Sequence, residues 1–404
     1  MSTSLLYHGW GLRGYRHCRT EFQEGAIQFV IEQAPEKLRC SCCGSGDVIR
    51  AGQAPRRFRG LPIGSRRTWI ALSVQRLTCR ACGRTRQANL GLADPRLSYT
   101  RAFERYALEL SRHRTLFAVA QHLGVGWDMI KDIQKRHLTR RFKRIRLRGL
   151  KRLAIDEISI GKGHRYFTVV LDLDSGAVVF IGDGKGAKSL DSFWKRLRAS
   201  RAKVRAVATD MSPAYTLAVQ ENLPQAVHGF DRFHVVKLFN DKLGDLRRHV
   251  QRSAETIEQK QVIKGTRWLL LKNPENLDDD RDERTRLDEA LRLNQPLAVA
   301  YYLKEDLRQR WEQPGKRAAG KFLTDWIKRA HASGVAMLKT LGNTLPLHRK
   351  GLLAWYDHRI STGPLEGTNN KIKTMQRQSY GFRDPEFFRL KIFAIHETNY
   401  ALTG

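Results

Sequence analysis

Three carboxylates stand at positions that a phosphodiester-cleaving site would require. Asp156 interrupts the apolar stretch 153–160, a predicted strand in which a carboxylate is costly to bury without a partner. Asp210 follows the predicted strand 204–208, at the end where α/β sheets bind their ligands. Glu366 begins a predicted helix. Each acid alone could be a capped or salt-bridged structural residue. Together they predict a catalytic site that holds two Mg²⁺ ions, with Mn²⁺ as a substitute.

The helix that begins near Glu366 has one polar and one apolar side. At about 100° per residue, four side chains fall within about 40° of one line: Glu366, Asn370, Lys373 and Arg377. Three apolar side chains fall on the opposite side: Leu365, Ile372 and Met375. The polar side therefore suits a metal ion and a DNA backbone, and the apolar side predicts burial. Glu157 points to the other face of its strand than Asp156 and is not nominated.

Four cysteines form two C-x-x-C-G units: Cys40, Cys43, Cys79 and Cys82. Two intervening residues let both thiolates of a unit reach one ion from a tight turn, and the glycine that follows gives the turn its backbone freedom. Four sulfurs from two such turns predict one structural Zn²⁺, closed and not catalytic. The stretch 69–74, a predicted strand before the second unit, fits a zinc ribbon. The alternative is a set of redox-active or unmatched thiols.

Two short predicted helices, 116–123 and 127–137, are joined by Gly124-Val125-Gly126. This is the layout of a helix-turn-helix, whose second helix reads DNA, although helical hairpins of other kinds share it. Residues 131–152 then carry eleven Lys and Arg and one Asp. Such an excess indicates phosphates opposite. We assign DNA contacts to Trp127 and seven cations: Lys131, Lys135, Arg136, Arg140, Arg141, Lys143 and Arg144.

The elements that must position the three acids follow this basic run. Predicted strands at 153–160, 166–173 and 177–181 precede an alternation of helix and strand, which is the order of a ribonuclease H-like sheet. The segment after Val235 is helical, and its acidic part, 275–289, is interpreted as a solvated loop or subunit contact. The predicted class is an α/β multidomain protein of five parts: zinc ribbon 1–95, helix-turn-helix with basic linker 96–150, core 151–236, all-α insertion 237–358, and the last part of the core 359–404.

The charge balance indicates a polyanionic partner. The 404 residues include 73 Lys and Arg against 40 Asp and Glu, a net charge of +33. No apolar run is long enough to span a membrane, and the N-terminus lacks the apolar stretch of a signal peptide. We therefore expect a cytoplasmic, nucleoid-associated protein that binds double-stranded DNA and no membrane.

Four ordered motifs resemble the DDE transposases of bacterial insertion sequences, ISL3 type. They lie at 155–166, 208–215, 230–237 and 361–373, and the zinc ribbon and helix-turn-helix match the same family's layout. The resemblance implies Asp156, Asp210 and Glu366 as the acidic triad, and a helical insertion before Glu366. Asp231-Arg-Phe-His234 looks like the D-x-x-H signature of insertion-bearing transposases, which would make Asp231 and His234 auxiliary residues. A structural Asp–His pair is the alternative.

The function implied is a transposase that binds the terminal inverted repeats of its element, cleaves the strand and joins it to target DNA. Joining two ends predicts at least a dimer. The rival interpretation is a transcriptional regulator whose α/β half does not catalyse, which would not need the three acids together. A structure-specific nuclease on the same fold is a milder rival, because it would not need two DNA-reading modules.

Overall fold

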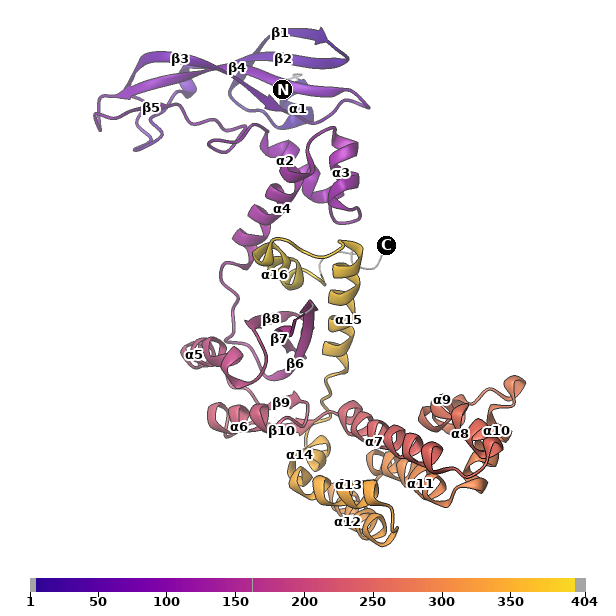
Figure 1. Cartoon of the computed structure of the whole chain (residues 1–404). Coiled ribbons are helices and arrows are strands. Elements are labelled where there is room, and N and C mark those ends of the chain that lie inside the picture. The colour runs from indigo at the N-terminus through magenta and orange to yellow at the C-terminus, as the bar shows by residue number, and fades with distance from the viewer. Residues whose placement is uncertain (1–4, 162, 397–404) are drawn as a thin grey trace. The chain divides into compact units, whose positions relative to one another are not determined.

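The computed structural model describes residues 5–161 and 163–396, which fall into two units (Figure 1). The N-terminal unit combines the described residues up to Lys143 with those from Gln378 onward. The central unit runs from Arg144 to Arg377. Within the described residues, no helix combines the length and the apolar character that a membrane crossing requires.

A five-stranded sheet opens the N-terminal unit. Its strands are β1 (Tyr15–Gln23), β2 (Ala26–Gln33), β3 (Val48–Arg59), β4 (Arg67–Cys79) and β5 (Thr85–Gln87). The order is β1-β2-β4-β3, with β5 also paired to β4. Along β4, Ile70, Leu72 and Val74 are buried against Trp10 of α1 (Leu5–Trp10), whereas the residues between them are not. This alternation confirms the predicted strand at 69–74 and leaves one face of the sheet open.

Three helices follow: α2 (Arg101–Leu110), α3 (Leu116–Leu123) and α4 (Trp127–Phe142). The Thr115 hydroxyl accepts the N–H of Ala118 and caps α3, which ends at Gly124 with φ +60°, a conformation that favours glycine. The predicted helix-turn-helix is confirmed, and α4 continues five residues past the predicted end at His137.

The C-terminal helix α16 (Pro385–Phe393) belongs to this same unit. Phe387 and Leu390 of α16 pack with Leu138 of α4. The segment predicted as the last part of the core, 359–404, is therefore divided: α15 (Gly363–Gln378) lies with the core up to Arg377, and α16 joins the helix-turn-helix.

The central unit contains the expected ribonuclease H-like sheet. Its strands are β6 (Arg152–Gly161), β7 (Arg165–Asp172), β8 (Val178–Asp183), β9 (Ala206–Thr209) and β10 (Val227–Phe230). The order is β8-β7-β6-β9-β10, antiparallel from β8 to β6 and parallel from β6 to β10. Helices α5 (Asp191–Ser200) and α6 (Pro213–Asn222) contribute Phe193 and Tyr215 to its core.

An all-α insertion separates β10 from α15. Its helices are α7 (Arg232–Ser253), α8 (Ile257–Lys264), α9 (Arg267–Leu271), α10 (Glu283–Leu293), α11 (Gln295–Gln309), α12 (Lys316–Ala332), α13 (Ala336–Leu347) and α14 (Arg349–Leu353). They share one core around Phe239 and Trp326. The acidic stretch is only partly a solvated loop, because Glu283 is buried in an ion pair with Lys272.

Candidate active site and zinc centre

Three aspartates lie side by side where the parallel pairing of β6, β9 and β10 ends: Asp156 within β6, Asp210 just after β9 and Asp231 just after β10. Ala154 of β6 is paired with Ala208 of β9, so Asp156 and Asp210, each two residues further on, lie at the same level of adjacent strands. Phe230 of β10 is paired with Thr209, which places Asp231 beside Asp210. Parallel pairing thus brings together the first two predicted acids, because both stand two residues after the paired residues Ala154 and Ala208, although β6 itself continues to Gly161.

Glu366 approaches this row on helix α15. The Asn369 amide Nδ2 donates to Asp156 Oδ2 at 2.9 Å, and Gln376 Nε2 donates to the Ile160 carbonyl at 2.6 Å, so α15 is attached along β6. Glu366 lies one helical turn before Asn369 and is half-buried. Its carboxylate therefore extends from the same side of the helix that contacts Asp156.

The three acids do not form a tight cluster in the described part of the chain. Among the described residues, the one group of three or more His, Cys, Asp or Glu whose ligand atoms all lie within 4.8 Å of one another is the four cysteines. Asp156, Asp210 and Glu366 do not form such a group. Like charges at this strand end repel one another unless cations lie between them.

The electrostatics of the strand ends favour a cation. Burial raises the pKa of the Asp156 carboxyl, and the negative charges of Asp210 and Glu157 raise it further. The N–H of Glu157 and the charge of His234 lower this pKa, but by less. Asp210 is half-buried, and its Oδ1 accepts the Ser212 N–H at 3.0 Å at the start of α6. Ser212 is the N-cap residue of α6 and Pro213 is in its first turn, but the Ser212 side chain makes no cap hydrogen bond.

Asp231 and His234 connect the strand ends to α15. Asp231 is 3% exposed, and its Oδ2 accepts the hydroxyl of Thr362, just before α15 begins. The same oxygen lies 3.7 Å from His234 Nδ1. Burial opposes protonation of His234, but its interaction with Asp231 and the charges of Asp156 and Asp210 outweigh burial and raise its pKa. The nearby aspartates thus favour the protonated form of His234.

Asn369 is the residue of this site that the sequence prediction missed. The helical-face argument selected its neighbour Asn370, which is exposed. In the described chain, Asn369 Oδ1 is buried and accepts no hydrogen bond, although Nδ2 of the same amide is bound to Asp156. The available signal was its position three residues after Glu366, which also puts it on the acid's side of the helix.

Glu157 has a different role. Its Oε1 accepts the Tyr215 hydroxyl at 2.6 Å and the Gly186 N–H at 2.9 Å. These bonds hold the β8–α5 connection against α6. Glu157 is therefore engaged on the side of β6 away from Asp156.

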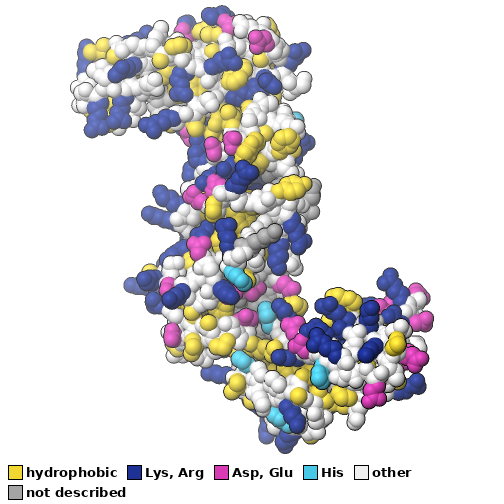
Figure 2. Space-filling model, in the orientation of Figure 1, with side chains coloured by type: hydrophobic (Ala, Val, Ile, Leu, Met, Phe, Trp, Pro, Cys, Tyr) yellow, Lys and Arg dark blue, Asp and Glu magenta, His cyan; other side chains and the backbone are white. Residues whose placement is uncertain are grey.

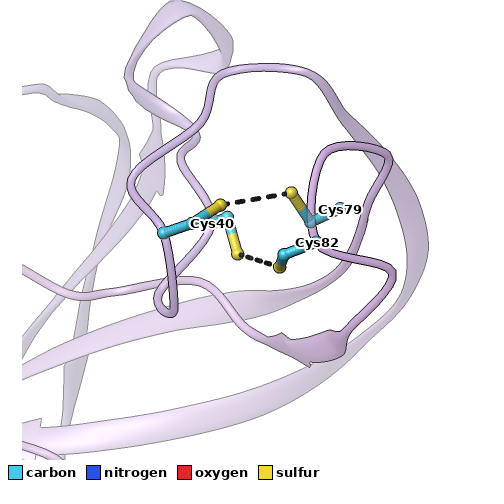
Figure 3. Close-up of side chains that lie close together, drawn as sticks. Cys40, Cys79 and Cys82 are labelled. Atoms are coloured by element: carbon cyan, nitrogen blue, oxygen red, sulfur yellow. Dashed lines mark hydrogen bonds between the residues drawn. The ribbon is translucent and has the colours of Figure 1, made fainter.

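The four cysteines converge from two knuckles, as Figure 3 shows for Cys40, Cys79 and Cys82. Cys40 Sγ lies 3.7 Å from Cys82 Sγ, and Cys43 Sγ lies 3.6 Å from Cys79 Sγ. A tetrahedral site with Zn–S bonds of about 2.3 Å requires sulfurs about 3.8 Å apart, so the thiolates fit zinc. Backbone N–H groups of Cys43 and Cys42 lower the pKa of Cys40 to about 6, which favours the thiolate that zinc binds.

Helix α4 carries its predicted DNA-binding cations, but acids of the same unit neutralise four of them. Arg136 and Arg140 pair with Glu104 of α2 at 2.9 and 2.8 Å. Lys131 and Lys135 pair with Asp384, at the N-cap of α16, at 3.4 and 3.0 Å. Glu104 and Asp384 come from distant parts of the sequence, so the charge count of residues 131–152 alone does not reveal them.

The remaining predicted DNA-binding residues are on the surface. Trp127 is 51% exposed at the first turn of α4. Arg141, Lys143 and Arg144 are exposed, and among the described residues neither Lys143 nor Arg144 forms an ion pair. On α15, three predicted residues are exposed: Asn370, Lys373 and Arg377. The opposite side is buried as predicted: Leu365, Ile372 and Met375.

Family comparisons agree with this arrangement. The family described as "Transposase" matches residues 153–392, and "zinc-finger of transposase IS204/IS1001/IS1096/IS1165" matches 36–82. "Helix-turn-helix domain of transposase family ISL3" matches 88–138. These three matches cover the predicted core, ribbon and reading module.

Individual relatives extend the agreement over almost the whole chain. The transposase for insertion sequence element IS1001 of Bordetella parapertussis is 33% identical over 97% of both chains. The transposase for IS1557 of Mycobacterium tuberculosis is 30% identical over 86% of this chain and 83% of its own. A solved structure, the Drosophila P element transposase strand transfer complex, covers 64% of this chain and 79% of its own at 12% identity and a TM-score of 0.33. The chain belongs to the ISL3 family of transposases.

Proposed function

We propose that this transposase binds the terminal inverted repeats of its own insertion sequence and catalyses Mg²⁺-dependent strand cleavage and strand transfer with Asp156, Asp210 and Glu366. The main support is the bond between Asn369 and Asp156, which attaches the Glu366 helix to the strand that bears the first acid. The parallel pairing of β6 and β9 adds Asp210 at the same level. This bond and this strand pairing support a single site for acids that come from three distant segments.

The side chains at this edge fit divalent metal ions. Asp156 is a carboxylate whose charge is disfavoured by burial and by Asp210, and Asn369 offers a buried oxygen without a hydrogen-bond donor. Hard oxygen ligands of this kind suit Mg²⁺ or Mn²⁺. Two bound ions would neutralise phosphate charge and favour deprotonation of the attacking oxygen.

The protein's own residues orient the reacting groups. Asn369 holds Asp156 in one rotamer, and the Asp231–Thr362 bond fixes where α15 begins. The charges of Asp156 and Asp210 raise the pKa of His234 and so favour its protonated form. We assign Asp231 and His234 auxiliary, positioning roles, because Asp231 is buried in contacts with Thr362 and His234.

DNA would be held by both units. In the N-terminal unit, Trp127 and the cations of α4 would contact the terminal repeat, with one structural zinc stabilising the ribbon. In the central unit, Asn370, Lys373 and Arg377 would follow the backbone of the cleaved strand. Two ends must be joined, so the active form would be at least a dimer, acting in the cytoplasm at the nucleoid.

The two rival functions receive less support. A transcriptional regulator has no need for aspartates aligned on β6 and β9 with an acidic helix attached to them, and the chain's family is one of transposases. A structure-specific nuclease would share the acids but not the separate zinc ribbon and helix-turn-helix.

The test is incubation of the full chain with duplexes that carry the element's end, in Mg²⁺, Mn²⁺ or Ca²⁺, with strand cleavage and joining to a target plasmid scored separately. We expect cleavage and joining with Mg²⁺ and Mn²⁺, and binding alone with Ca²⁺, which is larger and looser in its coordination. Cleavage that persists in EDTA, or that is equal on unrelated duplexes, would contradict the proposal.

A further inference from the structure

One face of the sheet in the N-terminal unit, called the open face here, is only partly covered by helices: Arg59 is buried and bonded to α3, whereas Arg57 and Arg67 are exposed. Residues of β4 alternate between the buried core and this open face, which carries Arg67, Trp69, Ala71 and Ser73. The partner strand β3 adds Arg57 opposite Ala71 and Arg59 opposite Trp69. The open face is therefore centred on a tryptophan with arginines around it.

Two guanidinium groups lie over the Trp69 ring, and the Arg67 side chain lies near one of them. Arg57 Cζ lies 4.1 Å from the centroid of its ring and Arg59 Cζ lies 5.4 Å away. Arg67 is close enough for its charge to add to burial in lowering the pKa of Arg59. A stack on tryptophan restricts the Arg57 side chain, so little rotamer freedom is left to lose when it binds an anion.

These charges have little compensation within the protein. The two acids on the same face, Glu21 and Glu32, are paired with Arg19 and Arg16. Across residues 5–161 and 163–396, neither Arg57 nor Arg67 forms an ion pair. Lys and Arg side chains also outnumber Asp and Glu on the side of the ribbon that Figure 2 presents. The cluster lacks an anion of its own.

The open face continues into the helix-turn-helix. Arg59 Nη2 donates to the Leu123 carbonyl at the end of α3, at 2.7 Å. Arg67 lies against the turn itself: its Nε is 2.7 Å from the point where the Cβ of any larger residue at position 124 would stand. Trp127, at the start of α4, follows three residues after Gly124. The arginine cluster and the reading helix thus flank one turn.

We propose that the open sheet face around Arg57, Trp69 and Arg67 is a second DNA-binding surface, which contacts backbone phosphates beside the segment that α4 reads. The inference rests on the proposed function, because the duplex is the element's end. A helix in the major groove leaves the adjoining backbone exposed, and arginine forks match phosphate oxygens in pairs. Such contacts fix the register of the protein on DNA and carry no base preference.

The experiment compares the full-length protein with an Arg57→Ala/Arg67→Ala variant by titration with end DNA and with an unrelated duplex at several salt concentrations. If each arginine contacts a phosphate, the slope of log K against log salt should fall by about two units, equally for both duplexes. Hydroxyl-radical footprinting should lose protection beside the α4 site while protection at that site remains. Zinc content and circular dichroism should be unchanged, because both side chains are exposed.

Arg76→Ala is the matched control, an exposed arginine seven residues after Trp69 on β4 and hence on the opposite side of the strand. An unchanged slope and footprint in the double variant, or an equal loss in Arg76→Ala, would overturn the inference. If wild-type protein bound both duplexes equally, this result would count against recognition of the element's end. The salt slope of the double variant would still decide whether this face contacts phosphates.

Discussion

The zinc centre and the acidic site are built in opposite ways. The four cysteines come from two knuckles of one small sheet, and their sulfurs approach to 3.6 and 3.7 Å. The acidic site draws on β6, β9 and α15, and the bond that joins two of these elements spans 213 residues of sequence. Among the described residues, the cysteines form a tight ligand group and the three acids do not.

The difference follows from what positions each ligand. A C-x-x-C-G turn sets the separation of its two sulfurs locally, so the zinc centre depends only on how β4 and β3 pair. The acids depend on strand pairing and on two side-chain bonds, Asn369 to Asp156 and Thr362 to Asp231. Loss of a cysteine should therefore affect folding, and loss of an acid should affect chemistry.

The largest effect is expected at the zinc centre. Cys43→Ser with Cys82→Ser should abolish binding of the one zinc per chain, because structural zinc sites contribute roughly 10–16 kcal/mol of binding free energy that is also folding free energy. Elemental analysis and hydrogen exchange would show zinc loss and exposed amides in β3 and β4, with β6 to β10 still protected.

Cys42→Ser is the control for the zinc prediction. Cys42 is adjacent to Cys43 in sequence but outside the four-sulfur group, and it is exposed. It should retain zinc. Equal zinc loss in both proteins would contradict the assignment of ligands.

The next effect is expected at the acids. Asp156→Asn, Asp210→Asn and Glu366→Gln should each lower cleavage and joining by about 10³-fold or more, because each removes a negative oxygen that two adjacent cations require. Double variants should lose little beyond the single ones, since the acids act as a unit. Folding and end binding, measured by thermal melting and gel shift, should stay at wild-type level.

A smaller effect is expected at Asp231. Asp231→Asn should lower the free energy of unfolding by about 2 kcal/mol, because it weakens a buried bond to Thr362 and the contact with His234. Cleavage should be reduced only in part. If Asp231→Asn abolished metal binding while Asp210→Asn still cleaved, the second acid would be Asp231.

The stability lost in Asp231→Asn should also depend on pH. The pKa of His234 is raised above its ordinary 6.5, so the stabilisation by protonated His234 is complete below about pH 6.5 and disappears as pH rises through the folded value. In denaturant titrations, the free energy of unfolding of wild type and variant should therefore differ more at pH 6 than at about pH 9. A difference that grows towards high pH would contradict a cationic His234.

The smallest effect is expected when basic residues in or after α4 are substituted. It should differ between cations that are exposed and cations that are paired with acids. Lys143→Gln/Arg144→Gln should reduce the salt slope of DNA binding by about two units, if both contact phosphates. Arg136→Gln/Arg140→Gln should change the slope less and should lower thermal stability, because Glu104, 5% exposed, would lose both partners. Equal slopes for the two pairs would show that the ion pairs of α4 open on binding DNA.

The sequence predicted the ribbon, the helix-turn-helix and the order of the five core strands, because alternating apolar residues and glycine turns report local structure. It also predicted which side of α15 is buried. What it missed depends on distant partners. Glu104 and Asp384 neutralise α4 from 36 and 249 residues away, and no local spacing indicates this. The contact of Asn369 with Asp156, and the packing of α16 on α4, likewise require the tertiary structure.

Arg59 fixes the spacing between the zinc ribbon and the helix-turn-helix. It is 2% exposed and donates to the carbonyls of Thr68 in the sheet and Leu123 in α3, so the ribbon and the helix-turn-helix cannot slide past each other. Modules joined by a flexible linker tolerate variable spacing between their half-sites, whereas two modules fixed to each other would not. One base pair inserted between their contacts would displace the second by about 3.4 Å and rotate it by roughly 35° around the duplex. The protein would then measure the length of its DNA site as well as its sequence.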